Sequence, residues 1–505
     1  MTATTLRWIA IRARRTGFKP ARRVRLTPSL VVTAPDGAPI SHQASSSEIS
    51  SVEGSATYPP AMRGAIAAGH PVTAEAGARV LLAGGNAVDA LLAAAFTAFV
   101  TEGPLTGPAG GGFLLVHEPG GEPTVLECFF AVPSARLGEM EEVVIDFADS
   151  GTQVFHIGLG SVAVPGLLLG LEEAHRQFAT RSWAELVAPA VELARKGFER
   201  DEPRAFLHRI LEPMLLHEEA GRRIYGDAAR VHTQEFVPTL ERIRDVGSAV
   251  VRELLPEFAD DLDAYRVASP SPLETTVLGR RTLSMPAPSL GGAVVERILE
   301  RLAAAGEPTP EDEARAVALA YGESGVGPLT GTTHVSVVDG TGMAAALSST
   351  LGSGSGLFRA GTQLNNMLGE LDVIGPGEHV PGERLASMMT PTIVLEDDRP
   401  RLVIGSAGSV RLAGAIAQVT WRILRGMHVA AAINAPRLHV EGSTVHLEGG
   451  FTAEEAETLD AHWEVVRWDG INLFFGGVQA VARTNDGTLE AAGDPRRGGM
   501  GLVVE

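Results

Sequence analysis

The stretch Gly331-Thr332-Thr333-His334-Val335-Ser336-Val337-Val338-Asp339 decides how the rest of this chain is interpreted. Apolar and polar residues alternate along it, and a Gly-rich turn separates it from a second apolar run, residues 343–347. This pattern predicts a β-hairpin. A Thr that follows a Gly at the start of a strand can become a new N-terminus, because its freed α-amine then serves as the base for its own hydroxyl. The same residues also fit an ordinary Thr-rich hairpin.

The composition places limits on the class of protein. Hydrophobic residues make up 45% of the 505 residues and charged residues 20%, which is typical of a globular protein. A formal net charge of −19 argues against nucleic acid or an anionic membrane as a partner. No apolar run reaches the length of a membrane span. The single cysteine, Cys128, excludes an intrachain disulfide and is interpreted as a packed thiol.

Residues 1–60 differ in composition from the rest of the chain. Eight Lys and Arg residues precede the first acidic one, and a Ser-rich segment spans residues 41–55. No apolar core of signal-peptide length follows the basic residues, so we expect a cytoplasmic protein. We predict that residues 1–60 form a disordered extension. A transit-like segment, a tail and sequence preceding a start at Met62 all remain open.

Helical and strand patterns both occur beyond residue 60. Helices are predicted from a cap at Thr73 to Leu82, from a cap at Asn86 to Val100, from Ser182 toward Gly197 and from Thr309 to about Tyr321. After Thr332 the pattern changes to hairpins, at residues 393–404 and 438–447, with helices over residues 408–424 and 452–462. This mixture predicts an α+β fold built of layers. The Gly-rich residues 323–331 are expected to be exposed before any cut.

Several motifs in a fixed order resemble the γ-glutamyltransferase family. The matching segments are Gly84-Gly85-Asn86-Ala87-Val88-Asp89-Ala90, Gly110-Gly111-Gly112-Phe113, the stretch that begins at Thr332, Ser348-Ser349-Thr350-Leu351-Gly352-Ser353-Gly354, Gly361-Thr362-Gln363-Leu364-Asn365-Asn366, Pro381-Gly382-Glu383-Arg384, Ser387-Met388-Met389-Thr390-Pro391-Thr392-Ile393-Val394 and Gly405-Ser406-Ala407-Gly408-Ser409-Val410-Arg411. The resemblance covers roughly residues 62 to 505. Each motif alone is weak, and their order makes the signal strong.

The resemblance implies the four-layer αββα sandwich of the N-terminal-nucleophile (Ntn) hydrolases. It also implies autocleavage between Gly331 and Thr332, which would leave a large subunit from residues 61–331 and a small subunit from residues 332–505 in one fold. Thr332 would be the nucleophile, and Thr350 would hydrogen-bond its amine. Gly408 and Ser409 would supply the oxyanion-hole amides. No cofactor or metal is implied, and His70, His117 and His334 lack metal-ligand spacing.

The positions that would bind a glutamyl group depart from the family pattern. Phe129 stands where the family has an Arg for the substrate α-carboxylate, and Glu370 replaces an Asp for the α-amine. Gly352 and Met367 replace polar residues. Of two carboxylate-binding serines, Ser387 remains and Met388 replaces the other. Arg384 and Arg411 are the only arginines in nearby motifs that could substitute for the missing carboxylate-binding Arg.

The resemblance therefore implies a hydrolase or acyltransferase that forms an acyl-enzyme with a small-molecule amide. γ-Glutamyl compounds such as glutathione are the default substrates. An acylase, or a hydrolase of C–C bonds in antibiotic biosynthesis, is the alternative that the replaced residues suggest. A degenerate homologue that only binds other molecules is a third possibility.

Overall fold

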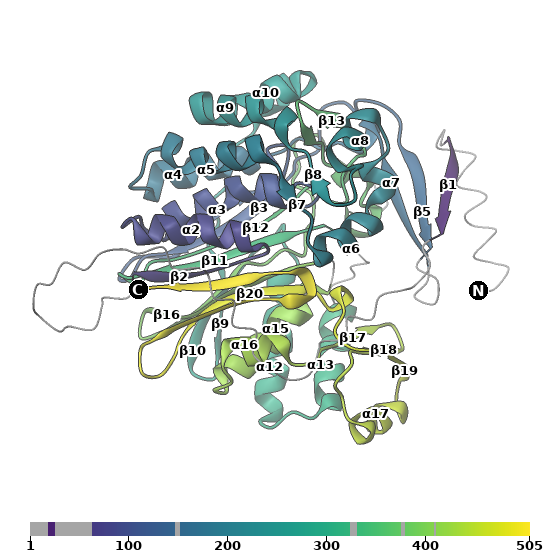
Figure 1. Cartoon of the computed structure of the whole chain (residues 1–505). Coiled ribbons are helices and arrows are strands. Elements are labelled where there is room, and N and C mark those ends of the chain that lie inside the picture. The colour runs from purple at the N-terminus through teal and green to yellow at the C-terminus, as the bar shows by residue number, and fades with distance from the viewer. Residues whose placement is uncertain (1–18, 26–62, 147–151, 324–330, 375–378, 409–410) are drawn as a thin grey trace, which may run out of the picture.

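The computed structural model describes residues 19–25, 63–146, 152–323, 331–374, 379–408 and 411–505. Two six-stranded antiparallel sheets lie face to face in this part of the chain, and helices cover the outer face of each sheet (Figure 1). This is a four-layer αββα sandwich, so the predicted fold class is confirmed.

The first sheet contains the hairpin that the opening stretch predicts. Its strand order is β22 (Met500–Val504), β2 (Gly64–Ala68), β11 (Thr333–Asp339), β12 (Ala344–Thr350), β3 (Gly111–His117) and β4 (Thr124–Cys128). β11 pairs with β12 in a register that places Thr333 opposite Ser349. The hairpin is thus confirmed, and it occupies the centre of the sheet. All seven residues of β12 are buried, and its first four, residues 344–347, are apolar, as expected of a strand covered on both faces.

The second sheet packs against the first. Its order is β21 (Leu489–Gly493), β20 (Gly477–Arg483), β16 (Arg399–Ala407), β15 (Thr392–Glu396), β10 (Arg280–Ser284) and β9 (Leu273–Val277). The predicted β15–β16 hairpin is confirmed. Only glycine fits at position 405 of β16, because a Cβ there would collide with the ring of His334 in β11. β11 and β16 therefore cross closely between the sheets.

Helices on the first sheet come from the N-terminal part of the chain. They are α2 (Pro71–Leu82), α3 (Ala87–Thr101), α4 (Leu167–Phe178) and α5 (Trp183–Lys196), with α6 (Glu202–Ile210), α7 (Glu212–Leu215), α8 (Glu219–Tyr225), α9 (Val237–Val246), α10 (Val250–Leu254) and α11 (Ala259–Ala264) beyond them. The capping boxes at Asn86 and Ser182 are confirmed. The cap at Thr73 is wrong: the His70 side chain caps α2, and Thr73 lies inside the helix.

Helices on the second sheet are α12 (Gly291–Ala305), α13 (Pro310–Gly322), α15 (Leu412–Leu424), α16 (Val429–Asn434) and, at the edge, α17 (Ala453–Asp460). The caps at Thr309 and Thr452 are present as capping boxes. α15 begins at Leu412 and not at Gly408 as predicted. Gly408 has φ +141°, which no helical residue adopts, so it ends β16 instead of opening the helix.

Smaller elements surround the two sheets. β5 (Glu141–Asp146) and β6 (Thr152–Ile157) form a sheet with β1 (Lys19–Arg25), and β17 (Leu438–Glu441), β18 (Thr444–Leu447) and β19 (Glu464–Arg467) form another. β7 (Phe198–Glu199) pairs with β8 (Arg230–Val231), and β13 (Phe358–Arg359) with β14 (Thr362–Gln363); α14 spans Leu371–Ile374. Residues 19–25 are thus a strand, which corrects the prediction of disorder there. The remainder of residues 1–60 and the Gly-rich residues 324–330 lie outside the described residues.

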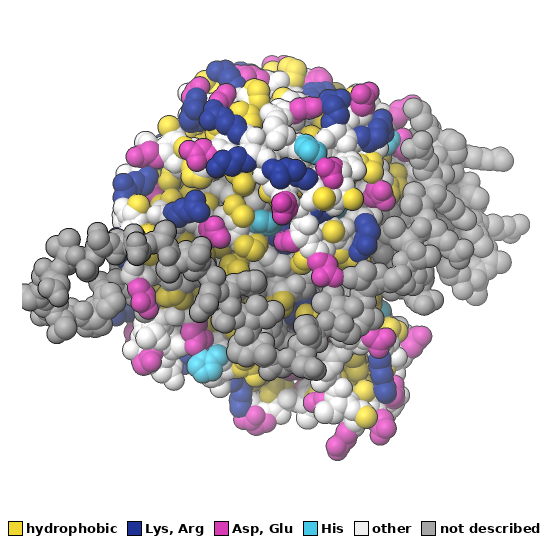
Figure 2. Space-filling model, in the orientation of Figure 1, with side chains coloured by type: hydrophobic (Ala, Val, Ile, Leu, Met, Phe, Trp, Pro, Cys, Tyr) yellow, Lys and Arg dark blue, Asp and Glu magenta, His cyan; other side chains and the backbone are white. Residues whose placement is uncertain are grey.

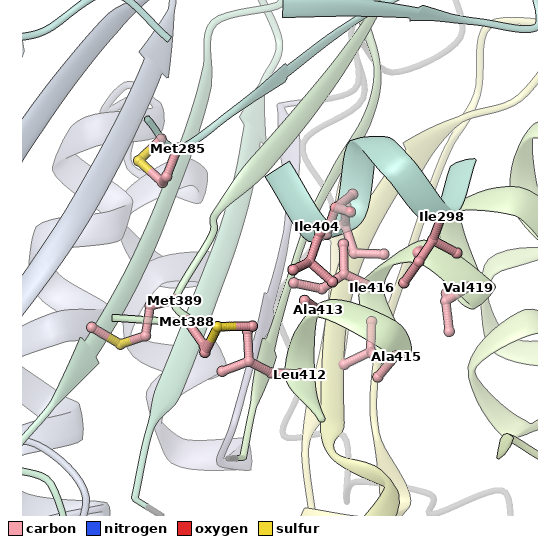
Figure 3. Packing of buried hydrophobic residues seen from close by; sticks show 14 of the residues in the cluster. Met285, Ile298, Met388, Met389, Ile404, Leu412, Ala413, Ala415, Ile416 and Val419 are labelled. Atoms are coloured by element: carbon pink, nitrogen blue, oxygen red, sulfur yellow. The ribbon is translucent and has the colours of Figure 1, made fainter. Parts of the chain in front are cut away.

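Two main buried clusters hold the layers together. Alternate residues of β11 and β12 separate them: Val335 and Leu347 pack toward α3, whereas Val338 and Ala346 face the second sheet. The cluster around the second sheet extends to α12 and α15, and Figure 3 shows Met388 packed into it beside Leu412. The first sheet is therefore packed on both faces, which holds the ends of β11 and β12 in a defined position.

The surface carries charges of both signs. On the face shown in Figure 2, Lys and Arg side chains alternate with Asp and Glu over the helical half of the molecule. Among the described residues, no helix is both long and apolar enough to cross a bilayer.

Candidate active site

The residues predicted to undergo autocleavage lie where β11 begins and β12 ends. Gly331 has φ +81°, and a Cβ at this position would collide with the carbonyl oxygen of Gly352. Only glycine fits such a backbone without strain. Thr332 follows it directly and is 4% exposed. The peptide bond between them is therefore held in a conformation that an L-residue in place of Gly331 would disturb.

Thr350 is directly hydrogen-bonded to this peptide bond. Its hydroxyl donates to the carbonyl oxygen of Gly331 and accepts from the backbone N–H of Gly352 at 2.8 Å. Thr350 is 4% exposed, so water does not replace these contacts. In the intact chain the hydroxyl thus polarises the carbonyl that Thr332 would attack. The predicted bond from Thr350 to the amine of a cut chain stays a prediction.

Side chains alternate along β11, which fixes where Thr332 points. The Thr333 hydroxyl donates to Glu102 at 2.6 Å, on the side of α3. His334 faces the second sheet and contacts Ser336 and Ser348 at 2.9 and 2.8 Å. By the same alternation Thr332 faces the space between the sheets. Burial lowers the pKa of His334 to about 3, so its ring is neutral at physiological pH.

The loop after β12 gathers several of the predicted substrate-binding residues. Gly352 has φ +68°, and a Cβ there would lie 3.1 Å from Glu370 Oε1 and 3.2 Å from Met367 Sδ. Glu370 accepts from the backbone N–H and the hydroxyl of Ser353 at 2.9 and 2.6 Å. Asn366, which sequence reasoning placed only in a family motif, accepts from the same N–H at 2.7 Å. The structure therefore brings Gly352, Met367 and Glu370 together beside Thr350.

Phe129 is buried, and its ring packs against other aromatic rings. It is 1% exposed, stacks on Phe113 at 5.2 Å and meets Phe130 edge-on at 4.9 Å. Met367 and Met388 belong to the same buried cluster. Ser387 is also buried, and its hydroxyl accepts from the N–H of Met389 at 3.1 Å. The positions expected to bind a carboxylate are thus buried and largely apolar.

The two arginines that could take the place of the family's carboxylate-binding Arg already have acidic partners. Arg384 donates to both oxygens of Glu127 at 2.9 and 3.1 Å and lies over the ring of Tyr265, 3.8 Å from its centroid. Arg411 donates to the carbonyl of Phe474 at 2.7 Å and lies 3.2 Å from Glu441. Moving either guanidinium to a substrate would leave a carboxylate unpaired, which is costly where it is buried, as at Glu127.

The predicted oxyanion hole is described only in part. Gly408 lies at the end of β16, beside Gly476. Ser409 lies outside the described residues. Among the described residues, no cluster of three or more His, Cys, Asp or Glu has metal-binding geometry. Cys128 is buried, and burial raises the pKa of its thiol well above the usual range.

Sequence reasoning missed three charged residues near the site: Glu102 and Arg204, which are buried, and Arg497, which is partly exposed. They come from α3, α6 and the segment between β21 and β22, which are far apart in the chain. The one available signal was the run Asp494-Pro495-Arg496-Arg497-Gly498-Gly499, where two adjacent arginines follow a turn.

Comparison with known proteins identifies the family. The model of the γ-glutamyltranspeptidase family matches residues 73–250 and 309–504. The chain belongs to this family. It is 28% identical to the glutathione hydrolase proenzyme of Pseudomonas aeruginosa, over 88% of this chain and 95% of that one. It is 27% identical to the acylase ACY 1 proenzyme of a Pseudomonas species, over 88% and 94%. The chain is thus an enzyme of this family, as are these relatives.

A solved structure supports the fold assignment. The cephalosporin acylase of Bacillus halodurans superposes with a TM-score of 0.74 at 20% identity, and the match covers 90% of this chain and all of that one. At this identity the likeness establishes the fold and not the substrate. The predicted membership of the γ-glutamyltransferase family and of the αββα class is confirmed.

Proposed function

We propose that this γ-glutamyltranspeptidase-family enzyme cuts itself between Gly331 and Thr332 and then uses Thr332 as its nucleophile. The contact between the Thr350 hydroxyl and the Gly331 carbonyl carries this proposal. Thr332 Oγ1 attacks the Gly331 carbonyl carbon, the C–N bond breaks, and an ester joins the two residues. Water then hydrolyses the ester, which leaves a carboxylate on Gly331 and a free amine on Thr332.

The Thr332 hydroxyl then acts on the substrate. The free amine of Thr332 accepts the hydroxyl proton, and Oγ1 attacks the carbonyl carbon of an amide. The substrate's amine leaves with a proton, and its acyl group remains on Thr332 as an ester. Water or another amine attacks that ester, and Oγ1 recovers its proton. The backbone amides at Gly408 and Ser409 are proposed to stabilise the oxyanion in both steps.

The acyl group is proposed to differ from a γ-glutamyl group. An α-carboxylate at the family's usual position would face Phe129 and Met388, which offer no hydrogen bond. Two missing charge-assisted hydrogen bonds correspond to a loss of roughly 10²- to 10⁴-fold. This favours an acylase-like substrate with an apolar acyl group over glutathione. A C–C bond hydrolase would use the same nucleophile and is the second alternative.

Mass spectrometry of the purified protein tests the proposal against a merely binding homologue. The wild type should give two fragments, one that ends at Gly331 and one that begins at Thr332. Thr332→Ala should stay full length and inactive. Cutting of this variant at the same bond, or full activity in an uncut wild type, contradicts the mechanism.

A further inference from the structure

Four buried charged residues take no part in the mechanism above. Arg437 donates to Asp494, and Arg496 donates to both Glu448 and Asp494. All four side chains are at most 1% exposed. Because buried charges are costly unless each is paired and hydrogen-bonded, the further partners of these residues show what the cluster holds in place.

The four charges hold one segment of backbone, residues 472–478. They are hydrogen-bonded to it at three points: the N–H of Asn472 at 2.8 Å, the carbonyl of Phe475 at 2.9 Å and the N–H of Val478 at 2.9 Å. The Asn472 side chain also accepts from the N–H of Phe474 at 2.9 Å. Hydrogen bonds to charged groups are stronger than those between neutral groups, so the backbone of this anchored segment is firmly held.

The anchored segment contacts the end of β16. The N–H of Gly477 donates to the Ser406 hydroxyl at 3.1 Å. A Cβ on Gly408 would lie 3.3 Å from the Cα of Gly476. Gly408, the first of the predicted oxyanion residues, therefore lies against a backbone that is itself held in place.

Arg411 ties the other end of the connection between β16 and α15 to the same segment. Its Nε donates to the Phe474 carbonyl at 2.7 Å, and its guanidinium carbon lies 3.9 Å from the centroid of the Phe474 ring. Its Nη1 lies 3.2 Å from Glu441. A carbonyl, an aromatic ring and a carboxylate thus fix one guanidinium, whose residue immediately precedes the first residue of α15.

The start of α15 also borders a position expected to contact the acyl group. Leu412 follows Arg411 and packs beside Met388 (Figure 3). A shift in the start of α15 would therefore move the predicted oxyanion residues relative to a bound substrate. Misplacement of a reacting group by about 1 Å can lower a rate about 10²-fold, so the position of this connection matters for catalysis.

We propose that Arg411 is a positioning residue of the oxyanion hole: it holds the connection between β16 and α15 against the anchored segment, so that the amides of Gly408 and Ser409 point toward the oxyanion. This inference rests on the proposed function, in which those two amides stabilise the oxyanion. In this role Arg411 touches neither the substrate nor the nucleophile. Its guanidinium stays on Phe474 and Glu441 throughout the reaction.

The test combines a neutral substrate with an inhibitor that acquires the charge of the transition state. With the processed enzyme in excess, release of p-nitroaniline from butanoyl p-nitroanilide reports the rate of acylation. Propylboronic acid has boron in place of the butanoyl carbonyl carbon. Thr332 Oγ1 adds to the boron, and the hydroxyl proton passes to the Thr332 amine. The boron becomes a tetrahedral anion, one oxygen of which occupies the oxyanion hole.

Arg411→Met should lower the maximal rate of acylation about ten- to a hundredfold and raise the inhibition constant of propylboronic acid by a similar factor. The enzyme concentration at half-maximal rate should stay within about twofold of the wild-type value, because the bound amide carries no developing charge. Arg411→Lys should recover part of both effects, since lysine keeps the charge but not the planar geometry. Cleavage between Gly331 and Thr332 should proceed normally, because its contacts lie at strand ends of the first sheet.

Arg425→Met is the matched control, at the other end of α15. Arg425 also donates to a backbone carbonyl, that of Gly306, and pairs with a carboxylate, that of Glu307. It also lies over an aromatic ring, that of Trp421. This variant should keep the wild-type rate of acylation and the wild-type inhibition constant.

The outcomes separate the inference from the proposed function. Wild-type acylation and inhibition in Arg411→Met overturn the inference, as does an equal loss in Arg425→Met. An effect confined to the half-maximal concentration would make Arg411 a substrate-binding residue, and loss of self-cleavage would place its role in the precursor; either result overturns the inference. In all these cases the wild type still supports the proposed function, whereas a wild type that neither cuts itself nor releases p-nitroaniline refutes that function. If Arg411→Met does not fold, Arg411→Lys decides, by a severalfold loss of acylation or by none.

Discussion

Thr350→Val is the most informative single substitution in this enzyme. Valine has nearly the shape of threonine and lacks the hydroxyl that donates to the Gly331 carbonyl and accepts from Gly352 N–H. Because the site is buried, the carbonyl and the N–H would both lose a partner that water cannot easily replace. The variant therefore tests whether this contact promotes cleavage or only stabilises the fold.

The two effects have different magnitudes and are measured separately. Each of the two unsatisfied buried groups costs about 1–3 kcal/mol, so the free energy of unfolding should fall by roughly 2–6 kcal/mol. Loss of a donor to a carbonyl under attack typically lowers a rate about 10²- to 10³-fold. Cleavage of Thr350→Val should thus take hundreds of times longer than cleavage of the wild type, and Thr350→Ser should largely restore it.

The assay follows the intact mass of freshly purified proenzyme over time and compares it with urea unfolding of the same sample. Thr233→Val is the matched control, because Thr233 is also buried and its hydroxyl donates to a backbone carbonyl, that of Ala194, at 2.9 Å. It should lose stability without slowing the cut. Thr350→Val that cuts at the wild-type rate and turns over substrate normally would refute the assigned role. In the cut enzyme, we further expect lower turnover, since the amine of Thr332 would lose the hydrogen bond predicted from Thr350.

Two further predictions concern specificity and pH. The processed enzyme should act feebly on a γ-glutamyl anilide and better on a neutral acyl anilide of similar size. Phe129→Arg should raise the turnover of the γ-glutamyl anilide. If the wild type hydrolyses the γ-glutamyl anilide as efficiently as other family members do, Phe129 does not occupy the position of the family's carboxylate-binding Arg. Because burial lowers the pKa of His334 to about 3, the unfolded chain binds a proton below pH ~6.5 that the folded chain does not. Stability is therefore fully present above that pH and is lost as the pH falls toward 3, by up to ~1.4 kcal/mol per unit. When the free energy of unfolding is measured in urea at pH 7, 6 and 5, His334→Gln should flatten its dependence on pH, whereas His462→Gln, at an exposed residue, should not. Equal slopes of unfolding free energy against pH for the two variants would show that His334 is not responsible.

Elements with strong local signals could be predicted from the sequence. The hairpin after Gly331 was predictable because its alternation and its Gly-rich turn both act over a few residues. Capping boxes at Asn86, Ser182, Thr309 and Thr452 were predictable for the same reason. The start of α15 was not, because the helical periodicity extends back to Gly408 while φ at that glycine is set by its packing against Gly476.

The composition of the site could be predicted only where a family motif marks it. The motifs identified Gly352, Met367 and Glu370, which the structure brings together. They gave no indication of Glu102, which belongs to no recognisable local pattern. The significance of Glu102 depends on a partner distant in the chain, Thr333.

The contacts for self-cleavage and those for substrate selection come from different elements. Gly331 and Thr350 lie at the ends of two neighbouring strands, and their contact depends on backbone geometry at Gly331 and Gly352. Phe129 follows β4 and Met388 precedes β15, and neither takes part in the hydrogen bonds of the Gly331–Thr332 bond.

Replacement of the carboxylate clamp by apolar residues can therefore change the substrate without removing the contacts that promote cleavage. A chain that keeps the first set of contacts and replaces the second is expected to be an active enzyme with another substrate. A degenerate binding protein would have no need for a glycine with positive φ and a buried hydroxyl at the same peptide bond.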